Sequence, residues 1–167
     1  FFLWSSQTLA TIGGAGVGIA VVWQVLVMKG SAVDLGLLVT LAMIPNLALL
    51  PFGGLAADRF SRRRILFVAA LISPFLAFGT SAMMHFGSLR IWHLYLLSLM
   101  RGTVEPFVIP AGRGIYAEVL PKEDLLRGNA LSSFSSQFTS ILAPALSGWI
   151  IETWGVPAAF VFQGILS

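Results

Sequence analysis

The sequence contains no cysteine and few charged residues. Its 167 residues include only ten Lys or Arg and seven Asp or Glu. Charged residues make up 10% of the chain, whereas a typical soluble domain has about 25%. The absence of cysteine excludes disulfides and thiolate metal sites. So few charges cannot cover a domain that is 57% hydrophobic, which excludes an ordinary soluble globule.

Long apolar runs take the place of the missing charges. The mean hydropathy is +0.89, and each full run exceeds the ~18 residues that mark a membrane-spanning helix. Five full runs and the start of a sixth cover residues 1–28, 35–57, 65–86, 91–117, 125–151 and 157–167. Because backbone groups in lipid must hydrogen-bond internally, these runs predict helices. We therefore expect an all-α, polytopic membrane protein. Both ends of the sequence fall within apolar runs, so we also expect a fragment of a longer chain.

The basic residues are distributed unevenly between the expected connections. Seven flank the second and fourth connections: Arg59, Arg62, Arg63, Arg64, Arg113, Lys122 and Arg127. Only Lys29 and Arg90 lie in the alternate connections. Since positively charged loops stay in the cytoplasm, this bias places the second and fourth connections inside. The net charge of +3 is thus interpreted as a topology signal, and no nucleic-acid partner is expected.

A motif at the end of the second run is the most specific feature of the sequence. Gly54 and Asp58 are four residues apart, so they share one helix face, and Arg59, Arg62 and Arg63 follow. A glycine on this face lets another helix approach closely. A carboxylate beside it can bind that helix's N-terminus. The alternative is a plain cluster of positive charge at a cytoplasmic helix end.

This motif resembles the Gly-x-x-x-Asp-Arg-x-Gly-Arg-Arg loop of the Major Facilitator Superfamily, between that family's helices two and three. Ser61 stands where the family has its second glycine, and serine disfavours a turn of positive φ. The resemblance implies that Gly54 and Asp58 contact the second half of a transporter and stabilise one end state. It also places Glu118 near Arg62 and Arg63, where a salt bridge would tie helices two to four together; the alternative is a solvated carboxylate.

A second motif lies in the fifth run. Ala143, Pro144, Ser147 and Gly148 resemble the Gly-Pro-x-x-Gly-Gly motif on helix five of the family's exporters, with Ala and Ser replacing two glycines. A proline inside a helix produces a kink, although an ordinary membrane-helix proline would do the same. Further segments along the whole chain are similar to the macrolide-efflux and siderophore-exporter branch. The resemblance implies the N-terminal six-helix half of a twelve-helix fold.

Two charges inside the fourth run are the candidates for substrate or proton chemistry. Arg101 and Glu105 are four residues apart and can pair along one helix face. Each charge alone costs about 2.5–3.5 kcal/mol in a membrane. The functional interpretation places them in a central cavity with Gln7 and Gln24; the alternatives are a self-neutralising structural pair and glutamines that cap helices or pack at interfaces.

Small and polar residues elsewhere are expected to have structural roles. We expect Gly14 and Gly18 to form a helix-packing face, and the serines and threonine at 132–139 to pack closely within the fifth run. His85 and His93 are interpreted as interfacial residues. We identify no catalytic motif, metal site or cofactor site.

The expected function is secondary active transport, with proton-coupled export of an amphipathic small molecule such as a drug, antibiotic or siderophore. The expected partners are this substrate, protons, the lipid bilayer and the missing C-terminal half. The expected location is the bacterial inner membrane. The alternative is a non-transporting domain of an intramembrane enzyme or of a signalling or scaffold protein.

The charge bias makes a topological prediction. In the full-length protein, freed of any other cysteines, Ser61→Cys should resist an impermeant thiol reagent on intact cells. Arg90→Cys, the external control, should be labelled. Labelling of Ser61→Cys from outside would reverse the assigned orientation.

Overall fold

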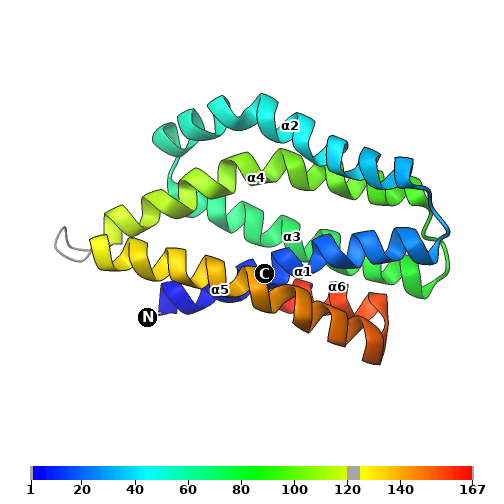
Figure 1. Ribbon diagram of the computed structural model, residues 1–167. Coiled ribbons are helices and arrows are strands. Elements are labelled where there is room, and N and C mark those ends of the chain that lie inside the picture. The colour runs from blue at the N-terminus through cyan, green and yellow to red at the C-terminus, as the bar shows by residue number, and fades with distance from the viewer. Residues whose placement is uncertain (1, 120–124, 167) are drawn as a thin grey trace.

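The computed structural model describes the backbone of residues 2–119 and 125–166 as six α-helices, with no strand in that part of the chain (Figure 1). Side chains are described for these residues except 2–11, 15, 113, 115–119, 125, 126 and 129. The helices are α1 (Phe2–Val27), α2 (Ala32–Arg59), α3 (Arg62–His85), α4 (Ile91–Val119), α5 (Leu125–Trp154) and α6 (Val156–Leu166). Each helix overlaps nearly all of one apolar run, so the observed secondary structure follows the hydropathy pattern.

Local backbone chemistry explains where several helices begin and end. Ser31 caps α2, because its side chain accepts a hydrogen bond from the Asp34 N–H while the Asp34 carboxylate accepts one from the Ser31 N–H. This capping box starts α2 at Ala32, three residues before the apolar run. Gly87 and Gly155 follow α3 and α5 with φ of 64° and 82°. This left-handed conformation, which glycine adopts readily, terminates helices.

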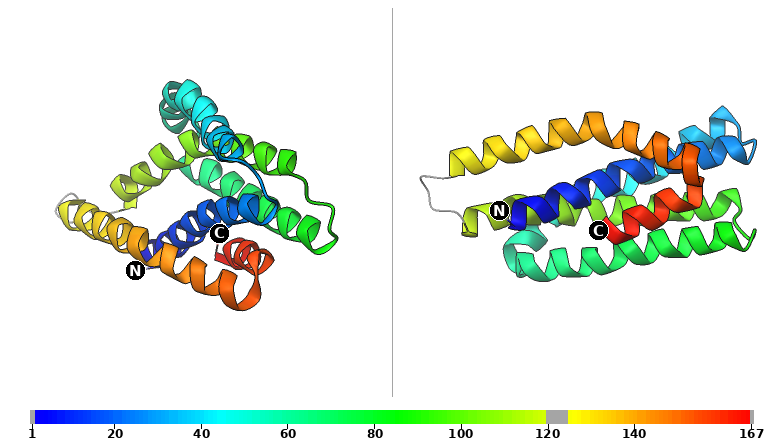
Figure 2. Two further views of the ribbon diagram at one scale, coloured as in Figure 1. Left: turned by 45° about the vertical axis from the view of Figure 1, so that its right-hand side comes forward. Right: turned by 90° about the horizontal axis from the view of Figure 1, so that it is seen from below.

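The helices run along a roughly common direction (Figures 1 and 2). Helix α2 packs along α4, α1 packs against α5 and α6, and α3 packs against α4 and α6. The α2–α3 connection lies at one end of the bundle, and the α1–α2, α3–α4 and α5–α6 connections lie at the other (Figure 1). Helices α1 to α5 therefore each cross the length of the bundle, and α6, with 11 residues, covers only part of it.

The core of the bundle lies between α1, α5, α6 and the first half of α4. Phe160 of α6 and Leu94 of α4 are both 0% exposed. Val17 and Val25 of α1 and Ile150 of α5 belong to the same cluster. This core holds α4 against α1 and so positions the polar groups farther along α4.

The outer surface of the bundle is apolar. Helices α2 and α3 are long and apolar enough to cross a membrane, with a mean hydropathy of 2.0 in each. Only 6% and 22% of their most apolar stretches are buried within the structure, whereas the core helix of a soluble protein is mostly buried. Exposed side chains such as Phe75 and Ile141 continue this surface. Among the described residues, two helices are therefore long and apolar enough to cross a membrane, and the larger number of spans expected from the sequence stays a prediction.

Backbone approaches backbone where α2 crosses α4. A Cβ atom on Gly53 would lie 2.1 Å from the carbonyl oxygen of Pro106, and one on Gly102 would lie 2.1 Å from the carbonyl oxygen of Ala42. No side chain can occupy either position at this helix separation. Glycine at these two positions therefore sets the distance between α2 and α4.

We predict that Gly53→Ala destabilises the full-length protein, because the added methyl group must push α2 away from the Pro106 carbonyl. Overpacking of this kind costs about 1–3 kcal/mol. Thermal unfolding in detergent measures the effect. Gly79→Ala is the matched control, since its Cβ would meet nothing within 4 Å and alanine is the better helix former. Equal melting temperatures for the two variants would contradict a contact limited by the glycine.

Candidate functional site

Arg101 connects the middle of α4 to α1. Its Nη2 donates a hydrogen bond of 3.0 Å to the carbonyl oxygen of Gly14, and the side chain is half-buried. A Cβ on Gly14 would stand 3.9 Å from this Nη2, which is an ordinary van der Waals distance, so position 14 lies directly beside the guanidinium. The positive charge is thereby fixed between two helices.

Glu105 lies one turn farther along α4 and faces α2. Its Oε2 accepts a hydrogen bond of 3.2 Å from Nδ2 of Asn46, and the side chain is exposed. Sequence reasoning missed Asn46, although an amide inside an otherwise apolar run is itself a signal that could have found it. We call Gly14, Asn46, Arg101 and Glu105 the α4 polar site.

The expected ion pair between Arg101 and Glu105 is replaced by two contacts to other helices. No salt bridge links these two residues in the described part of the chain, because Arg101 turns to α1 and Glu105 turns to α2. Spacing along one helix fixes only that two side chains share a face. It does not account for partners that neighbouring helices offer. The site therefore spans α1, α4 and α2 through hydrogen bonds.

The structure places neither of the two glutamines expected in the same cavity at the α4 polar site. Gln24 is ten residues after Gly14, which is about 15 Å along the helix. It makes no side-chain hydrogen bond to any described residue. The side chain of Gln7 lies outside the described residues. The placement of Gln24 near the end of α1 separates it from the α4 polar site.

The α2–α3 connection is fastened to α4 by Arg62. Its Nη1 donates a hydrogen bond of 2.9 Å to the carbonyl oxygen of Gly114. A Cβ on Gly114 would lie 2.4 Å from Arg62 Nε, so a side chain at this position would displace the guanidinium that crosses α4. Sequence reasoning singled out Arg62 and missed Gly114. The side chain of Glu118, expected as a salt-bridge partner here, lies outside the described residues.

The other residues of this loop face outward. Asp58, Arg59 and Arg63 are exposed, and a Cβ on Gly54 would meet nothing within 4 Å. Within this chain the close contact belongs to Gly53, and Gly54 lies on an open face. Ser61 has a φ of −63°, so the connection turns without the positive φ that the family's glycine would allow. Serine is therefore compatible with the observed backbone.

The helix-five motif packs on α1 with one side only. Ala143 and Ser147 are buried, while Pro144 and Gly148 are exposed. A Cβ on Gly16 would lie 2.6 Å from Ser147 Oγ, so the close α1–α5 approach occurs at Gly16.

Among the described residues, Gly14 and Gly18 do not form the predicted packing face: a Cβ on Gly18 would meet nothing within 4 Å, and Gly14 faces Arg101. The serine-rich part of α5 divides in the same way. Ser135 and Thr139 are buried, whereas Ser133 and Ser136 are exposed.

A second polar contact between α2 and α4 lies at the end of the bundle where both helices begin. The hydroxyl of Tyr95 donates a hydrogen bond to Oδ1 of Asp34, the residue of the α2 capping box. Sequence reasoning missed this pair, which is separated by 61 residues. Nearby, His93 stacks on Trp92, and no group of metal-ligating residues occurs among the described residues.

Comparison with known proteins adds an independent finding to this geometry. The chain is 27% identical over 159 residues to the MFS-type transporter YfiS of Bacillus subtilis, covering 95% of this chain and 37% of that protein. It is 22% identical over 158 residues to macrolide efflux protein A of Streptococcus pyogenes, covering 95% and 39%. It is 28% identical over 141 residues to enterobactin exporter EntS of Citrobacter koseri, covering 83% and 33%.

The chain thus spans about a third to two fifths of the length of these relatives. The family profile of the Major Facilitator Superfamily matches residues 3–167, which is nearly the whole chain and includes every helix described above. The chain therefore belongs to the Major Facilitator Superfamily.

Proposed function

We propose that this chain forms the N-terminal half of a secondary transporter of the bacterial inner membrane, which exports an amphipathic small molecule in exchange for protons. Membership of the family supports transport over an intramembrane enzyme or a scaffold. The names of two relatives, a macrolide efflux protein and an enterobactin exporter, support export as the direction. The same names support a substrate larger and more amphipathic than an inorganic ion.

One observation carries this proposal: an exposed carboxylate in the middle of an apolar bundle. Glu105 lies near the centre of α4, where a charge costs about 2.5–3.5 kcal/mol unless it faces water or a partner. Asn46 satisfies only part of its hydrogen-bonding capacity, since an ionised carboxylate has about four acceptor positions. The remaining capacity is available to a proton or to a cationic group of the substrate.

The two neighbours of Glu105 act on it differently. Asn46 donates to the carboxylate and orients it, and the same amide can accept through its oxygen once the carboxyl group is protonated. Arg101 is fixed on the Gly14 carbonyl, so its charge stays one turn from Glu105 without neutralising it in a salt bridge. Release of a proton from Glu105 therefore leaves a carboxylate near a positive charge.

Movement between the two end states would use the open face of α2. Gly54 and Asp58 share this face, and no described residue would lie within 4 Å of a Cβ on Gly54. The face is therefore available to the second half of the transporter. Arg62 holds the adjacent connection to α4, so a contact made at Asp58 bears directly on the helix that carries Glu105. Alternating access would then rock the two halves about a site near the midplane.

We predict that Glu105→Gln abolishes proton-coupled efflux by the full-length protein while leaving its stability nearly unchanged. Glutamine keeps the size and an acceptor oxygen for Asn46 but cannot exchange a proton. Efflux is measured in inverted vesicles, and melting temperature in detergent. Thr103→Val is the matched control on α4, because the Thr103 hydroxyl bonds only its own helix, at Leu99. Normal efflux by Glu105→Gln would remove the basis of the proposal.

Arg101 distinguishes the proposal from a purely structural pair. Arg101→Met should lower stability, since a hydrogen bond to a charged group contributes about 1.5–3 kcal/mol. Adding Glu105→Gln should not restore it, because the lost partner is the α1 backbone. A double variant that is both stable and active would show that the two charges only balance each other.

We predict that Asp58→Asn impairs transport severalfold with normal membrane insertion. The amide keeps the shape but loses the charge, which is worth about 0.3–1 kcal/mol at an exposed helix N-terminus and up to ~2 kcal/mol when partly buried. Asp58→Glu, which retains the charge, should recover part of the activity. Transport rates compared at equal expression provide the measurement, and an unimpaired Asp58→Asn would be evidence against a charge-based contact.

A further inference from the structure

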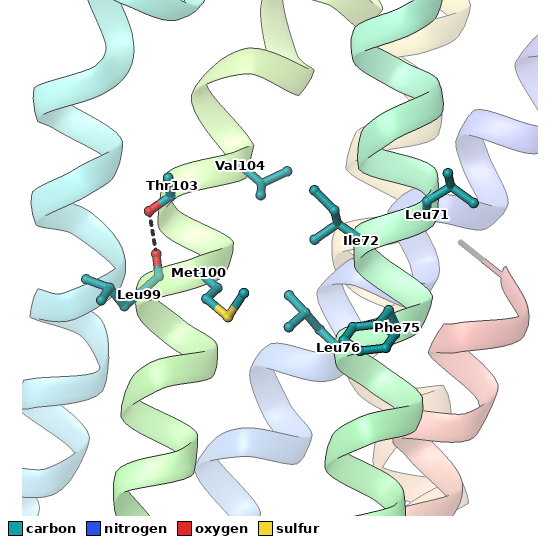
Figure 3. A pocket seen from close by; sticks show the side chains of 8 residues that line it. All are labelled: Leu71, Ile72, Phe75, Leu76, Leu99, Met100, Thr103 and Val104. Atoms are coloured by element: carbon teal, nitrogen blue, oxygen red, sulfur yellow. Dashed lines mark hydrogen bonds between the residues drawn. The ribbon is translucent and has the colours of Figure 1, made fainter.

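An apolar groove of about 580 Å³ lies between α3 and α4 (Figure 3). Four residues of α3 between Leu71 and Leu76 and four of α4 between Leu99 and Val104 line it. Thr103 is the one polar residue of this lining, and its hydroxyl donates to the Leu99 carbonyl at 2.8 Å. The groove therefore offers no free side-chain hydrogen-bond donor and suits a hydrocarbon ligand.

The groove is separate from the α4 polar site. Thr103 is two residues from both Arg101 and Glu105, and two residues correspond to about 200° around a helix. The groove therefore opens on the other side of α4. Its α3 rim is on the outer surface of the bundle, where Leu71 and Phe75 are 57% and 77% exposed. In a membrane this position meets lipid.

The same face of α3 has positive charge at one end. Arg63 and Arg64 lie in the first turn and are exposed. Neither side chain hydrogen-bonds to, or forms a salt bridge with, any residue that the structure describes. Phe67, Leu71 and Phe75 follow at four-residue spacing, which aligns them on one helix face. An exposed basic pair thus stands at the head of a continuous apolar stripe that reaches the groove.

The distances match one leaflet of a bilayer. Leu71 and Leu76 lie seven and twelve residues after Arg64, which corresponds to about 10 and 18 Å along a helix. Half of the hydrocarbon core is about 15 Å thick. If a methylene group takes a volume near the roughly 30 Å³ of a water molecule, a groove of 580 Å³ holds on the order of 20 of them. That is the size of one acyl chain.

We propose that this groove binds one acyl chain of an anionic phospholipid whose phosphate lies on Arg63 and Arg64. Guanidinium groups match phosphate geometry, and basic residues at the membrane surface attract anionic headgroups. The charge of the two arginines selects an anionic headgroup over a zwitterionic one. The bound lipid fills the gap between α3 and α4, and its binding does not depend on whether the protein transports.

The test uses the full-length protein purified in detergent and native mass spectrometry. The probes are phosphatidylglycerol and phosphatidylcholine with the same acyl chains. Two variants separate the headgroup from the chain: Arg63→Gln with Arg64→Gln removes the charges, and Thr103→Phe fills the groove. The matched controls are Arg90→Gln, an exposed arginine at the other end of the bundle, and Ala48→Phe, an exposed position on α2. Leu71→Ala, which removes part of the groove rim, replaces Thr103→Phe if that variant does not insert.

We expect phosphatidylglycerol to bind more tightly than phosphatidylcholine. The affinity for phosphatidylglycerol should fall about fivefold for each arginine removed. Thr103→Phe should also weaken phosphatidylglycerol binding by at least about fivefold. Both control variants should bind normally, and free glycerol phosphate should not displace the lipid. Equal binding of the two lipids, or unchanged binding by the arginine variant, would overturn the headgroup assignment. Unchanged binding by the groove variant, or displacement by glycerol phosphate, would overturn the acyl-chain assignment.

Discussion

The close parallel contact of α2 with α4 determines most of what this bundle can do. At Gly53 and Gly102 the two backbones meet with no side chain between them. This separation allows a short amide such as Asn46 to reach Glu105 across the interface. It also brings Tyr95 to Asp34 at the opposite end. A bulkier interface would lengthen both contacts, so the polar chemistry of α4 depends on two residues that have no side-chain chemistry.

The two sides of α4 differ in chemical character. One side holds charges against α1 and α2, and the other is a hydrocarbon surface facing α3. A helix in lipid can keep a charge near its centre only when the charge faces protein or water. The division explains why Arg101 and Glu105 are tolerated within two turns of a groove that offers no free hydrogen-bond donor. Helix α4 thus keeps its two charged side chains on one side and an apolar surface on the other.

Hydropathy and charge were sufficient to predict the helices, because a bilayer requires every long apolar run to satisfy its own backbone. Individual contacts were harder to predict. The spacing of Arg101 and Glu105 indicated a pair, but partners on α1 and α2, 87 and 59 residues away, compete for them. Glycines at adjacent positions, Gly53 and Gly54, look alike in a sequence, and only the rotation of α2 against α4 separates the packed one from the open one. Asn46 and Gly114 were missed because each acts through a residue that is distant in the chain.

The hydrogen bond from Arg101 to Gly14 ends on a backbone carbonyl, and this has a consequence for how the site tolerates sequence change. No substitution on α1 can delete an acceptor that every amino acid carries. Selection at position 14 therefore acts only on the size of the side chain. A Cβ there would lie at an ordinary contact distance of 3.9 Å from the guanidinium. Alanine should therefore be accepted and larger, branched side chains rejected. Related chains could thus vary at this position in α1 while keeping the same arginine in place.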